Sequence, residues 1–318
     1  MKYRRLGNCG ARVSVVGLGS WITIGGTVDK KTGNDLIKYA FDNGINFFDT
    51  ADIYAIGSAE KFLGMSLKNF KRQDLFIASK CFWPMSKNPN DKGLSRKHIT
   101  ESVNNSLKNL KTDYIDLYQC HRYDSETPVE ETCRAFNTLI EQGKVLYWGT
   151  SEWAGDQIRE AVMICDKYNL HKPVSNQPQY SLLYRDIETN GVINYCKKEG
   201  IGQVVWSPLA QGVLTGKYNK KKIDKDSRLM DKKNSVFVQK LASDENLKKV
   251  EKLISIAEDL KTPVSNVALA WCLRNNIISS VITSATKLSQ LKETIKASEL
   301  ELSEEILKKI ENNFKVNK

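Results

Sequence analysis

Short apolar segments rich in β-branched residues alternate along this sequence with longer segments of helical periodicity. The expected strands are residues 13–18, 45–48, 75–79, 114–118, 145–149, 173–176, 203–206 and 277–282. The expected helices are residues 30–43, 58–69, 95–110, 128–142, 156–168, 186–199, 243–260, 263–275, 287–297 and 303–314. Because parallel strands need crossover connections, which are usually helices, eight such units predict a (β/α)8 barrel.

A doubly wound open sheet is the main competing fold. When it binds a dinucleotide, it normally carries a G-x-G-x-x-G turn after its first strand. The corresponding turn here, residues 17–26, lacks the third glycine at the required place. We therefore expect one barrel domain over residues 1–318, with residues 1–10 forming a hairpin that closes its bottom. The long irregular segment 214–242 follows the seventh strand, where a barrel places its binding loops.

The composition is that of an ordinary globular protein, with 41% hydrophobic and 27% charged residues, so a disordered chain is excluded. The net charge of +11 raises the question of a polyanionic partner. No interleaved basic and aromatic motif supports nucleic-acid binding, and no apolar run reaches the ~18 residues of a membrane span. The seven cysteines are scattered without a C-x-x-C pair, which disfavours disulfides and zinc and predicts a cytoplasmic protein without a metal site.

Four polar side chains stand at or just after three consecutive expected strands. Asp49 ends the second strand and Tyr54 follows in the same loop, while Lys80 ends the third strand and His121 follows the fourth. Active sites of (β/α)8 barrels lie at the C-terminal ends of the strands. The four side chains are therefore expected to meet in one pocket.

Such a cluster suits proton donation to a carbonyl group. A tyrosine has an ordinary pKa near ~10, and a nearby lysine ammonium is expected to lower the pKa of Tyr54 toward the working range. Asp49 would hold Lys80 in place, and a neutral His121 would orient the carbonyl oxygen. The set contains no nucleophile and no metal-ligand cluster, so we predict carbonyl reduction by hydride from a nicotinamide cofactor.

Other interpretations of these residues are weaker. Each of the four side chains, taken alone, is as readily explained by a structural role as by a catalytic one. A Cys120–His121 dyad is disfavoured because adjacent residues of a strand point to opposite faces. Zinc binding through Cys81, Cys120 and His121 lacks a signature spacing, and the strand ends do not offer the paired carboxylates of a glycosidase.

Several longer motifs resemble the aldo-keto reductases over essentially the whole chain. They are Phe48-Asp-Thr-Ala-Asp-Ile-Tyr, Gly93-Leu-Ser-Arg-Lys-His-Ile, Pro128-Val-Glu-Glu-Thr, Tyr147-Trp-Gly-Thr-Ser and Trp206-Ser-Pro-Leu-Ala-Gln-Gly-Val-Leu-Thr-Gly-Lys-Tyr. These segments look most like the subgroup of voltage-gated potassium channel β-subunits and their bacterial oxidoreductase relatives. The resemblance implies that Tyr54 is the general acid, tuned by Lys80 and Asp49, and that His121 orients the carbonyl.

The resemblance also implies a set of residues that bind NADP(H). By position they are Ser20, Trp21, Asp49, Ser151, Gln177, Trp206, Ser207, Pro208, Leu209, Ala210, Gln211, Lys217, Arg228, Ser284, Thr286, Gln290 and Glu293. Ser284 and Thr294 stand where family members usually carry Gly and Asn. Lys287, with Lys292 nearby, is expected to favour NADP over NAD by offering positive charge to a 2′-phosphate.

A small carbonyl compound is the expected substrate, held by Trp21, Tyr54, Phe82 and Trp83, with Tyr123 as a further candidate. Arg122 is open to two interpretations, either pairing with an anionic substrate group or forming a surface ion pair. Channel β-subunits carry Asn where His121 stands, so the resemblance favours a working reductase over a redox-sensing regulatory module. The subgroup also contains tetramers, whereas other members of the family are monomers.

The positive charge is concentrated in one segment. Residues 217–240 hold nine basic and three acidic side chains, which gives this segment an excess of +6. The segment follows the seventh expected strand, on the face where an anionic dinucleotide would lie. Its placement predicts a small anionic ligand and no polyanionic partner.

Overall fold

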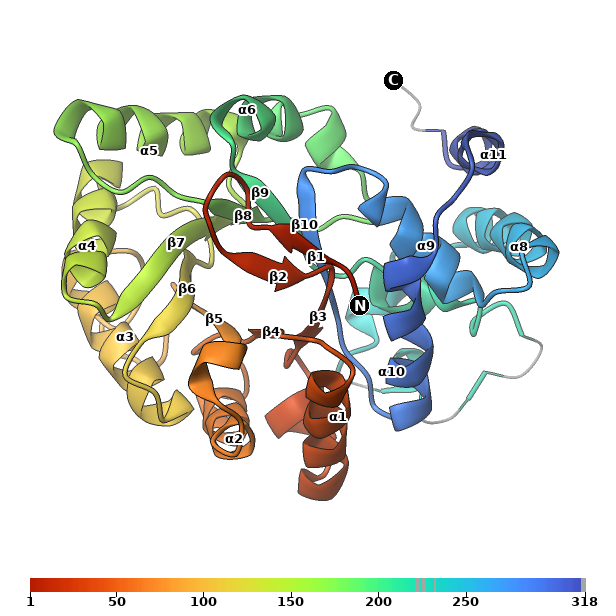
Figure 1. The fold of residues 1–318 in the computed structure, drawn as a ribbon, viewed down its shortest axis with the longest axis horizontal. Helices are drawn as coiled ribbons and strands as arrows, with labels where there is room; N and C mark the ends of the chain where they lie inside the picture. The colour runs from red at the N-terminus through yellow and green to blue at the C-terminus, as the bar shows by residue number, and fades with distance from the viewer. Residues whose placement is uncertain (221–222, 225–226, 232, 316–318) are drawn as a thin grey trace.

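The computed structural model describes residues 1–220, 223–224, 227–231 and 233–315. Eight parallel strands form a closed barrel in the order β10-β3-β4-β5-β6-β7-β8-β9, as the alternation predicts (Figure 1). The strands are β3 (Val16–Gly19), β4 (Phe47–Asp49), β5 (Phe76–Cys81), β6 (Ile115–Cys120), β7 (Val145–Ser151), β8 (Ser175–Gln177), β9 (Gly202–Val205) and β10 (Ile278–Thr283). β10 pairs with both β3 and β9 and so closes the barrel.

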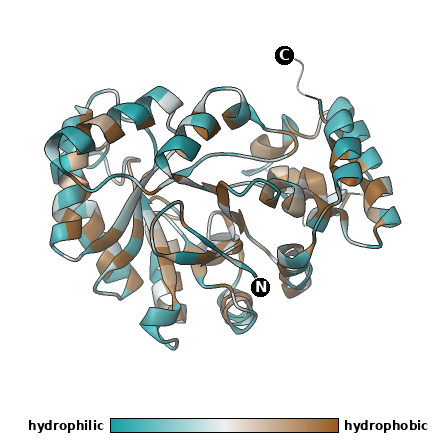
Figure 2. Cartoon of the chain, turned by 45° about the horizontal axis from the view of Figure 1, so that its top comes forward, coloured by the Kyte–Doolittle hydropathy of each residue, from teal (hydrophilic) through white to brown (hydrophobic). Residues whose placement is uncertain are grey.

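Helices surround the barrel; most bury one face, α9 is buried on nearly all sides, and α11 packs against α8. They are α1 (Lys30–Asp42), α2 (Ser58–Leu67), α3 (Arg96–Leu110), α4 (Val129–Glu141), α5 (Gly155–Tyr168), α6 (Val192–Glu199), α7 (Val236–Gln239), α8 (Asp244–Asp259), α9 (Val264–Leu273), α10 (Leu288–Thr294) and α11 (Glu304–Asn313). Hydrophilic and hydrophobic residues share the same helices in Figure 2, as expected for elements that bury one face. Side chains of Asp29, Ser95, Ser243 and Ser303 accept hydrogen bonds from backbone N–H groups in the first turns of α1, α3, α8 and α11.

A hairpin of β1 (Tyr3–Arg5) and β2 (Arg12–Ser14) lies across one end of the barrel (Figure 1). The expected strand 13–18 is therefore wrong in one respect, because its first residues belong to this hairpin and the barrel strand starts at Val16. Leu6 and Val13, in and next to the hairpin, are buried in one apolar cluster with Phe47 and Phe76 of the barrel strands. This apolar contact stabilises the hairpin against the end of the barrel.

Two expected helices differ from those in the structure. The segment 186–199 begins as a short 3-10 turn, Asp186–Glu188, and α6 starts only at Val192. Gly191 separates the two parts with a φ of 83°, a left-handed conformation that glycine adopts without a Cβ clash. The segment 287–297 divides into α10 and a 3-10 turn, Ile295–Glu299.

The segment after β9 is largely irregular, as expected, and contains 3-10 turns at Ala210–Thr215 and Arg228–Met230 before α7. Lys221, Lys222, Lys225, Asp226 and Lys232 of the basic segment lie outside the described residues. None of the helices that the structure describes is long and apolar enough to cross a membrane.

Candidate active site

A cavity of about 1610 Å³ opens at the C-terminal ends of the barrel strands. Strand-end residues Asp49, Ser151, Gln177 and Thr283 line it, together with the loops after β9 and β10. Small-molecule pockets usually measure ~300–1000 Å³, so this cavity has room for a dinucleotide as well as a second, smaller molecule.

Lys80 lies beneath this cavity with its side chain fully buried. Its Nζ donates to Asp49 Oδ2 at 2.7 Å and to the carbonyl oxygen of Thr50 at 2.7 Å, and it lies 3.4 Å from Tyr54 Oη. Burial lowers the pKa of Lys80, but Asp49 and Tyr54 outweigh burial and raise it overall. Lys80 is therefore a charged ammonium group that faces the tyrosine hydroxyl.

Asp49 joins this ion pair to the opposite side of the barrel. Its Oδ1 accepts a hydrogen bond from Gln177 Nε2 at 2.9 Å, while Oδ2 accepts the bond from Lys80. Both carboxylate oxygens of this buried residue thus have donors. Gln177, which ends β8, is thereby fixed in the cavity wall.

Tyr54 differs in one respect from the sequence-based expectation. Burial raises its pKa, and this effect exceeds the lowering by Lys80 because Asp49 offsets part of the lysine charge. Lys80 does lower the Tyr54 pKa, but the expected net lowering toward the working range is wrong. The hydroxyl keeps its proton at neutral pH, so the proton is present on Tyr54, and the ammonium of Lys80 opposes the weakening of this acid by burial.

His121 lies beside this hydroxyl and lines the same cavity. The centres of the His121 and Tyr54 rings are 5.6 Å apart, with the rings edge to face. Burial, then the charges of Lys80 and Arg122, hold the pKa of His121 well below its usual value. The imidazole is thus neutral at physiological pH and can either donate or accept a hydrogen bond.

The loop that carries Tyr54 rests on a buried acidic network. Asp52 accepts hydrogen bonds from Ser102 Oγ at 2.7 Å and from the backbone N–H of Ile53 at 2.6 Å. Burial raises the pKa of Asp52 to about 7, and the nearby Glu60 adds to the rise. Asp52 is therefore partly protonated near neutral pH.

We predict that the stability of Asp52→Asn, relative to that of the wild-type protein, increases as the pH rises. The unfolded chain releases the Asp52 proton near its ordinary pKa of 3.8, whereas the folded protein retains it to about pH 7. Wild-type stability therefore falls over this interval by ~2–4 kcal/mol from this group, and the uncharged variant avoids that loss. Urea unfolding at pH 5 and pH 8 measures the difference. The exposed Asp113→Asn variant controls for the lost charge, and an equal effect of Asp52→Asn at both pH values contradicts the prediction.

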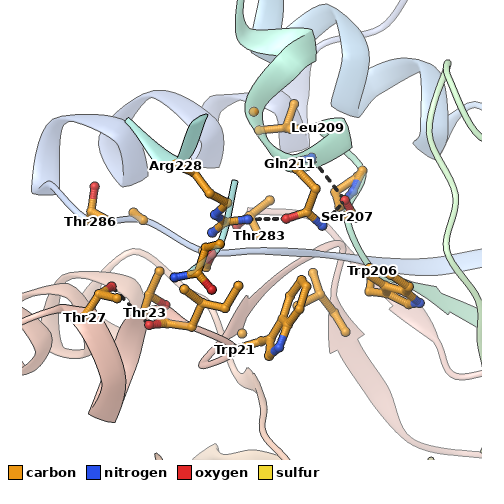
Figure 3. Close-up of a pocket in the computed structure, with 18 of the residues that line it drawn as sticks. Trp21, Thr23, Thr27, Trp206, Ser207, Leu209, Gln211, Arg228, Thr283 and Thr286 are labelled. Carbon is orange, nitrogen blue, oxygen red and sulfur yellow. Dashed lines mark hydrogen bonds between the residues drawn. The ribbon is translucent and has the colours of Figure 1, made fainter. Parts of the chain in front are cut away.

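The loop after β9 forms the second wall of the cavity. Ala210, Gln211 and Gly212 have successive φ values of 48°, 57° and 92°, and a Cβ on Gly212 would lie 2.7 Å from Lys217 Nζ. Figure 3 shows Arg228 and Gln211 pointing toward each other, and Arg228 donates a hydrogen bond to Gln211 Oε1. Consecutive left-handed residues of this kind are costly and cluster at functional sites.

Electrostatics in this wall favour an anion. Burial, then the charge of Arg228, lowers the pKa of Lys217, and burial lowers the pKa of Arg228. Within the described parts of the chain, neither residue forms an ion pair with a carboxylate. Ser227 Oγ, which is buried at the same wall, also lacks a hydrogen-bond partner there. These residues fit the phosphates of a dinucleotide.

The loop after β10 completes this side of the cavity. Gln290 Oε1 accepts a hydrogen bond from the backbone N–H of Thr286 at 2.9 Å, and Glu293 accepts one from Ser265. Lys287 lines the cavity with its Nζ 3.8 Å from Asp224 Oδ2. Lys292 is not among the lining residues, and its Nζ lies 5.5 Å from the centre of the Tyr39 ring.

Most of the expected cofactor residues line this one cavity, namely Trp21, Asp49, Ser151, Gln177, Trp206, Ser207, Pro208, Leu209, Gln211, Lys217, Arg228, Ser284, Thr286, Gln290 and Glu293. Ser20 and Ala210 are not among the lining residues. Both are buried, and Ser20 Oγ is directed to Thr50 Oγ1, to which it donates a hydrogen bond at 2.8 Å. Of the expected substrate residues, Trp21, Tyr54 and Trp83 line the cavity. Phe82 does not, and packs edge to face against Trp83.

Aromatic side chains contact one another across the mouth of the cavity. The centres of the Trp21 and Trp206 rings are 5.7 Å apart (Figure 3). The Trp21 ring also lies 5.2 Å from the ring of Phe237 in α7, measured between ring centres. Trp206 Nε1 donates to Glu152 Oε1 at 2.7 Å, which fixes the indole at the end of β9. The segment after β9 therefore reaches across the cavity to the loop after β3.

Sequence reasoning missed the lining residues Ile22, Thr23 and Thr27 in the loop after β3. This loop makes an irregular turn over Thr23–Thr27, in which Ile24 is extended and Gly25 is left-handed with a φ of 74°. The Gly25-Gly26 pair was the one available signal, since paired glycines mark loops that approach other groups closely. Among the described residues, no cluster of three or more His, Cys, Asp or Glu side chains is arranged to hold a metal.

Comparison with known proteins gives a consistent result. A family model described as aldo/keto reductase family matches residues 15–313. A probable voltage-gated potassium channel subunit beta from Arabidopsis thaliana is 44% identical over 93% of this chain and 91% of the relative. A protein of the same description from Oryza sativa subsp. japonica is 42% identical over 98% and 96%. A putative subunit beta from Schizosaccharomyces pombe is 42% identical over 97% and 92%.

Proposed function

Because this chain belongs to the aldo/keto reductase family, we propose that it reduces aldehydes and ketones to alcohols with NADPH as the reductant. The observation that carries the proposal is the arrangement of Lys80, Asp49 and Tyr54 beside a neutral His121 in one large cavity. A protonated phenol next to a buried ammonium is an acid without a competing nucleophile.

In the proposed mechanism Tyr54 Oη donates the proton that the carbonyl oxygen gains. Lys80 stabilises the phenolate left behind, and Asp49 holds Lys80 in position. His121, being neutral, donates a hydrogen bond that orients the carbonyl toward Tyr54. The nicotinamide cofactor, when bound, supplies the hydride.

We assign the cofactor to the wall formed by the loops after β9 and β10. Ser151 and Gln177 would hold the nicotinamide carboxamide, and Lys217 and Arg228 would bind the pyrophosphate. Lys287 would pair with the 2′-phosphate that distinguishes NADPH from NADH. The two half-buried cations, Lys217 and Arg228, have no carboxylate partners among the described residues and support this assignment.

Lys287→Ala should raise the KM for NADPH about tenfold and change the KM for NADH little, because one charge-assisted contact to phosphate is lost. Lys292→Ala is a matched control, since this lysine lies over Tyr39 and not in the cavity lining. Initial rates at varied cofactor concentration give both constants. An equal effect of Lys287→Ala on the two cofactors would assign the 2′-phosphate contact to another residue.

A regulatory role is the second candidate, and the names of the relatives favour it. The three relatives named above are described as probable or putative voltage-gated potassium channel subunits beta, so a second proposal is that this chain reports its nucleotide state to a partner protein. A regulator of this kind would bind the nucleotide tightly and turn over slowly. We favour the reductase because His121 lies beside Tyr54, so a proton donor and a group that can orient the carbonyl are both present.

The two candidates are separated by measuring NADPH oxidation with a panel of aliphatic and aromatic aldehydes, with NADH tested in parallel. A reductase turns over many times on at least one aldehyde and prefers NADPH. A regulator binds NADPH in an equilibrium titration but shows at most a single turnover. Failure to bind either nucleotide would contradict both candidates.

We place the protein in the cytoplasm. All seven cysteines are free, and six of them are buried. Free thiols persist in a reducing compartment, which supports this location. Fractionation of cells with an antibody to the protein tests it, and recovery with a membrane or secreted fraction would refute it.

A further inference from the structure

One cation of the cavity lies apart from the others. Arg122 follows His121 just beyond the end of β6 and lines the same cavity as Tyr54. The other lining cations come from the loops after β9 and β10, namely Lys217, Lys220, Arg228, Lys233 and Lys287. β6 stands opposite β10 in the eight-stranded ring, so Arg122 faces those loops from the other side of the barrel.

The guanidinium of Arg122 is held in place but is not neutralised. Its Nη1 donates to the backbone carbonyl of His121 at 2.5 Å, and its central carbon lies 5.4 Å from the centre of the Trp83 ring. No Asp or Glu in the described part of the chain forms an ion pair with it. An arginine has five N–H donors, so most of the hydrogen-bonding capacity of Arg122 is available to a ligand.

Arg122 is also close to the reacting groups. Burial and the charge of Lys80 lower the pKa of His121, and Arg122 contributes to the same lowering. The Trp83 ring, 36% exposed, lies 6.2 Å from the His121 ring, measured between ring centres. The Trp83 ring therefore offers an apolar surface that is near both His121 and the guanidinium of Arg122.

We propose that Arg122 binds a carboxylate on the substrate, so that the enzyme prefers carbonyl compounds that carry a carboxylate beyond an apolar or aromatic body. This inference rests on the proposed reductase function and specifies its substrate class. A planar guanidinium binds a carboxylate through two parallel hydrogen bonds, which fixes orientation as well as affinity. The substrate body would pack against Trp83, and its carbonyl would then lie toward Tyr54 and His121.

The test compares 4-carboxybenzaldehyde with its methyl ester, methyl 4-formylbenzoate, which has nearly the same shape without the charge. The measured quantity is the ratio of kcat/KM for acid over ester. Arg122→Gln should lower this ratio about tenfold, and Arg122→Lys should retain most of it. Taking the ratio removes any effect of Arg122 on Tyr54 and His121, because both substrates share it. Arg159→Gln, an exposed position on α5 outside the cavity lining, controls for the change in net charge.

A second measurement does not need turnover. Calorimetric titration with benzoate and with benzamide, at saturating NADP, gives the affinity for an anion and for a neutral analogue. Arg122→Gln should weaken benzoate binding about tenfold and benzamide binding much less. An unchanged acid-to-ester ratio, or equal weakening of both analogues, overturns the role of Arg122. If no aldehyde is reduced but benzoate binding depends on Arg122, the reductase function fails and the anion site stands.

Discussion

Tyr54→Phe should lower kcat for aldehyde reduction at least about 100-fold while the Kd for NADPH changes less than about twofold. The variant keeps the ring and loses only the hydroxyl that lies 3.4 Å from Lys80 Nζ. Loss of a positioned general acid typically costs ~10²–10⁴-fold in rate. Single-turnover rates with a bound cofactor and an aldehyde, together with a fluorescence titration of NADPH, measure the two quantities.

Tyr39→Phe is the matched control for this variant. Tyr39 lies on α1, and its ring faces Lys292 outside the cavity lining, so the same oxygen is removed without touching the site. Turnover that survives in Tyr54→Phe would assign the proton to another donor, with His121 as the next candidate. A large loss in Tyr39→Phe would show that a tyrosine hydroxyl far from the cavity affects activity through the fold.

The arrangement of the barrel was predictable because it follows from local patterns. Each β-branched segment is followed by a helical segment with an apolar face, and this repetition predicts an α/β fold. The count of eight units and the missing third glycine in residues 17–26 then favour the closed barrel over an open sheet. Lys80 was predictable for a related reason. A lysine at the end of an apolar strand is costly unless it is paired, and the structure shows that pair with Asp49.

The positions beyond the strand ends were less predictable. Inside a strand, alternate residues point to opposite faces, but this rule stops where the strand stops. Ser20 and Phe82 each follow directly after a strand, and Ala210 begins the 3-10 turn in the loop after β9. The structure places none of them in the cavity lining. Their orientation depends on loop contacts, such as the bond from Ser20 to Thr50, which link segments far apart in sequence.

The electrostatic state of Tyr54 could not be derived from the residue list. The sequence indicates that Lys80 and Asp49 are near the Tyr54 hydroxyl. Whether the Tyr54 pKa is raised or lowered, however, depends on how far the folded loop excludes water from that hydroxyl. Burial raises the pKa of Tyr54 more than Lys80 lowers it, in part because Asp49 already satisfies the ammonium. The hydroxyl therefore keeps its proton at neutral pH, and Lys80 is the group that would stabilise the phenolate once that proton is transferred.

Lys80→Met should have the second large effect, lowering both kcat and stability. The change leaves the buried Asp49 carboxylate with Gln177 as its remaining side-chain donor among the described residues. Removing one partner of a buried ion pair typically costs ~3–5 kcal/mol, because the other charge stays buried without compensation. We therefore expect a clear decrease in the urea midpoint and a rate loss of at least about 100-fold.

The double variant Lys80→Met/Asp49→Asn separates these two consequences. An asparagine at position 49 keeps an acceptor for Gln177 Nε2 and removes the buried negative charge, so most of the lost stability should return. Activity should not return, because no cation then remains to stabilise the Tyr54 phenolate. Recovery of both stability and turnover would show that Lys80 only maintains the fold. Recovery of stability alone shows that the rate loss does not come from unfolding, and it assigns the buried Lys80–Asp49 ion pair a direct part in proton transfer from Tyr54.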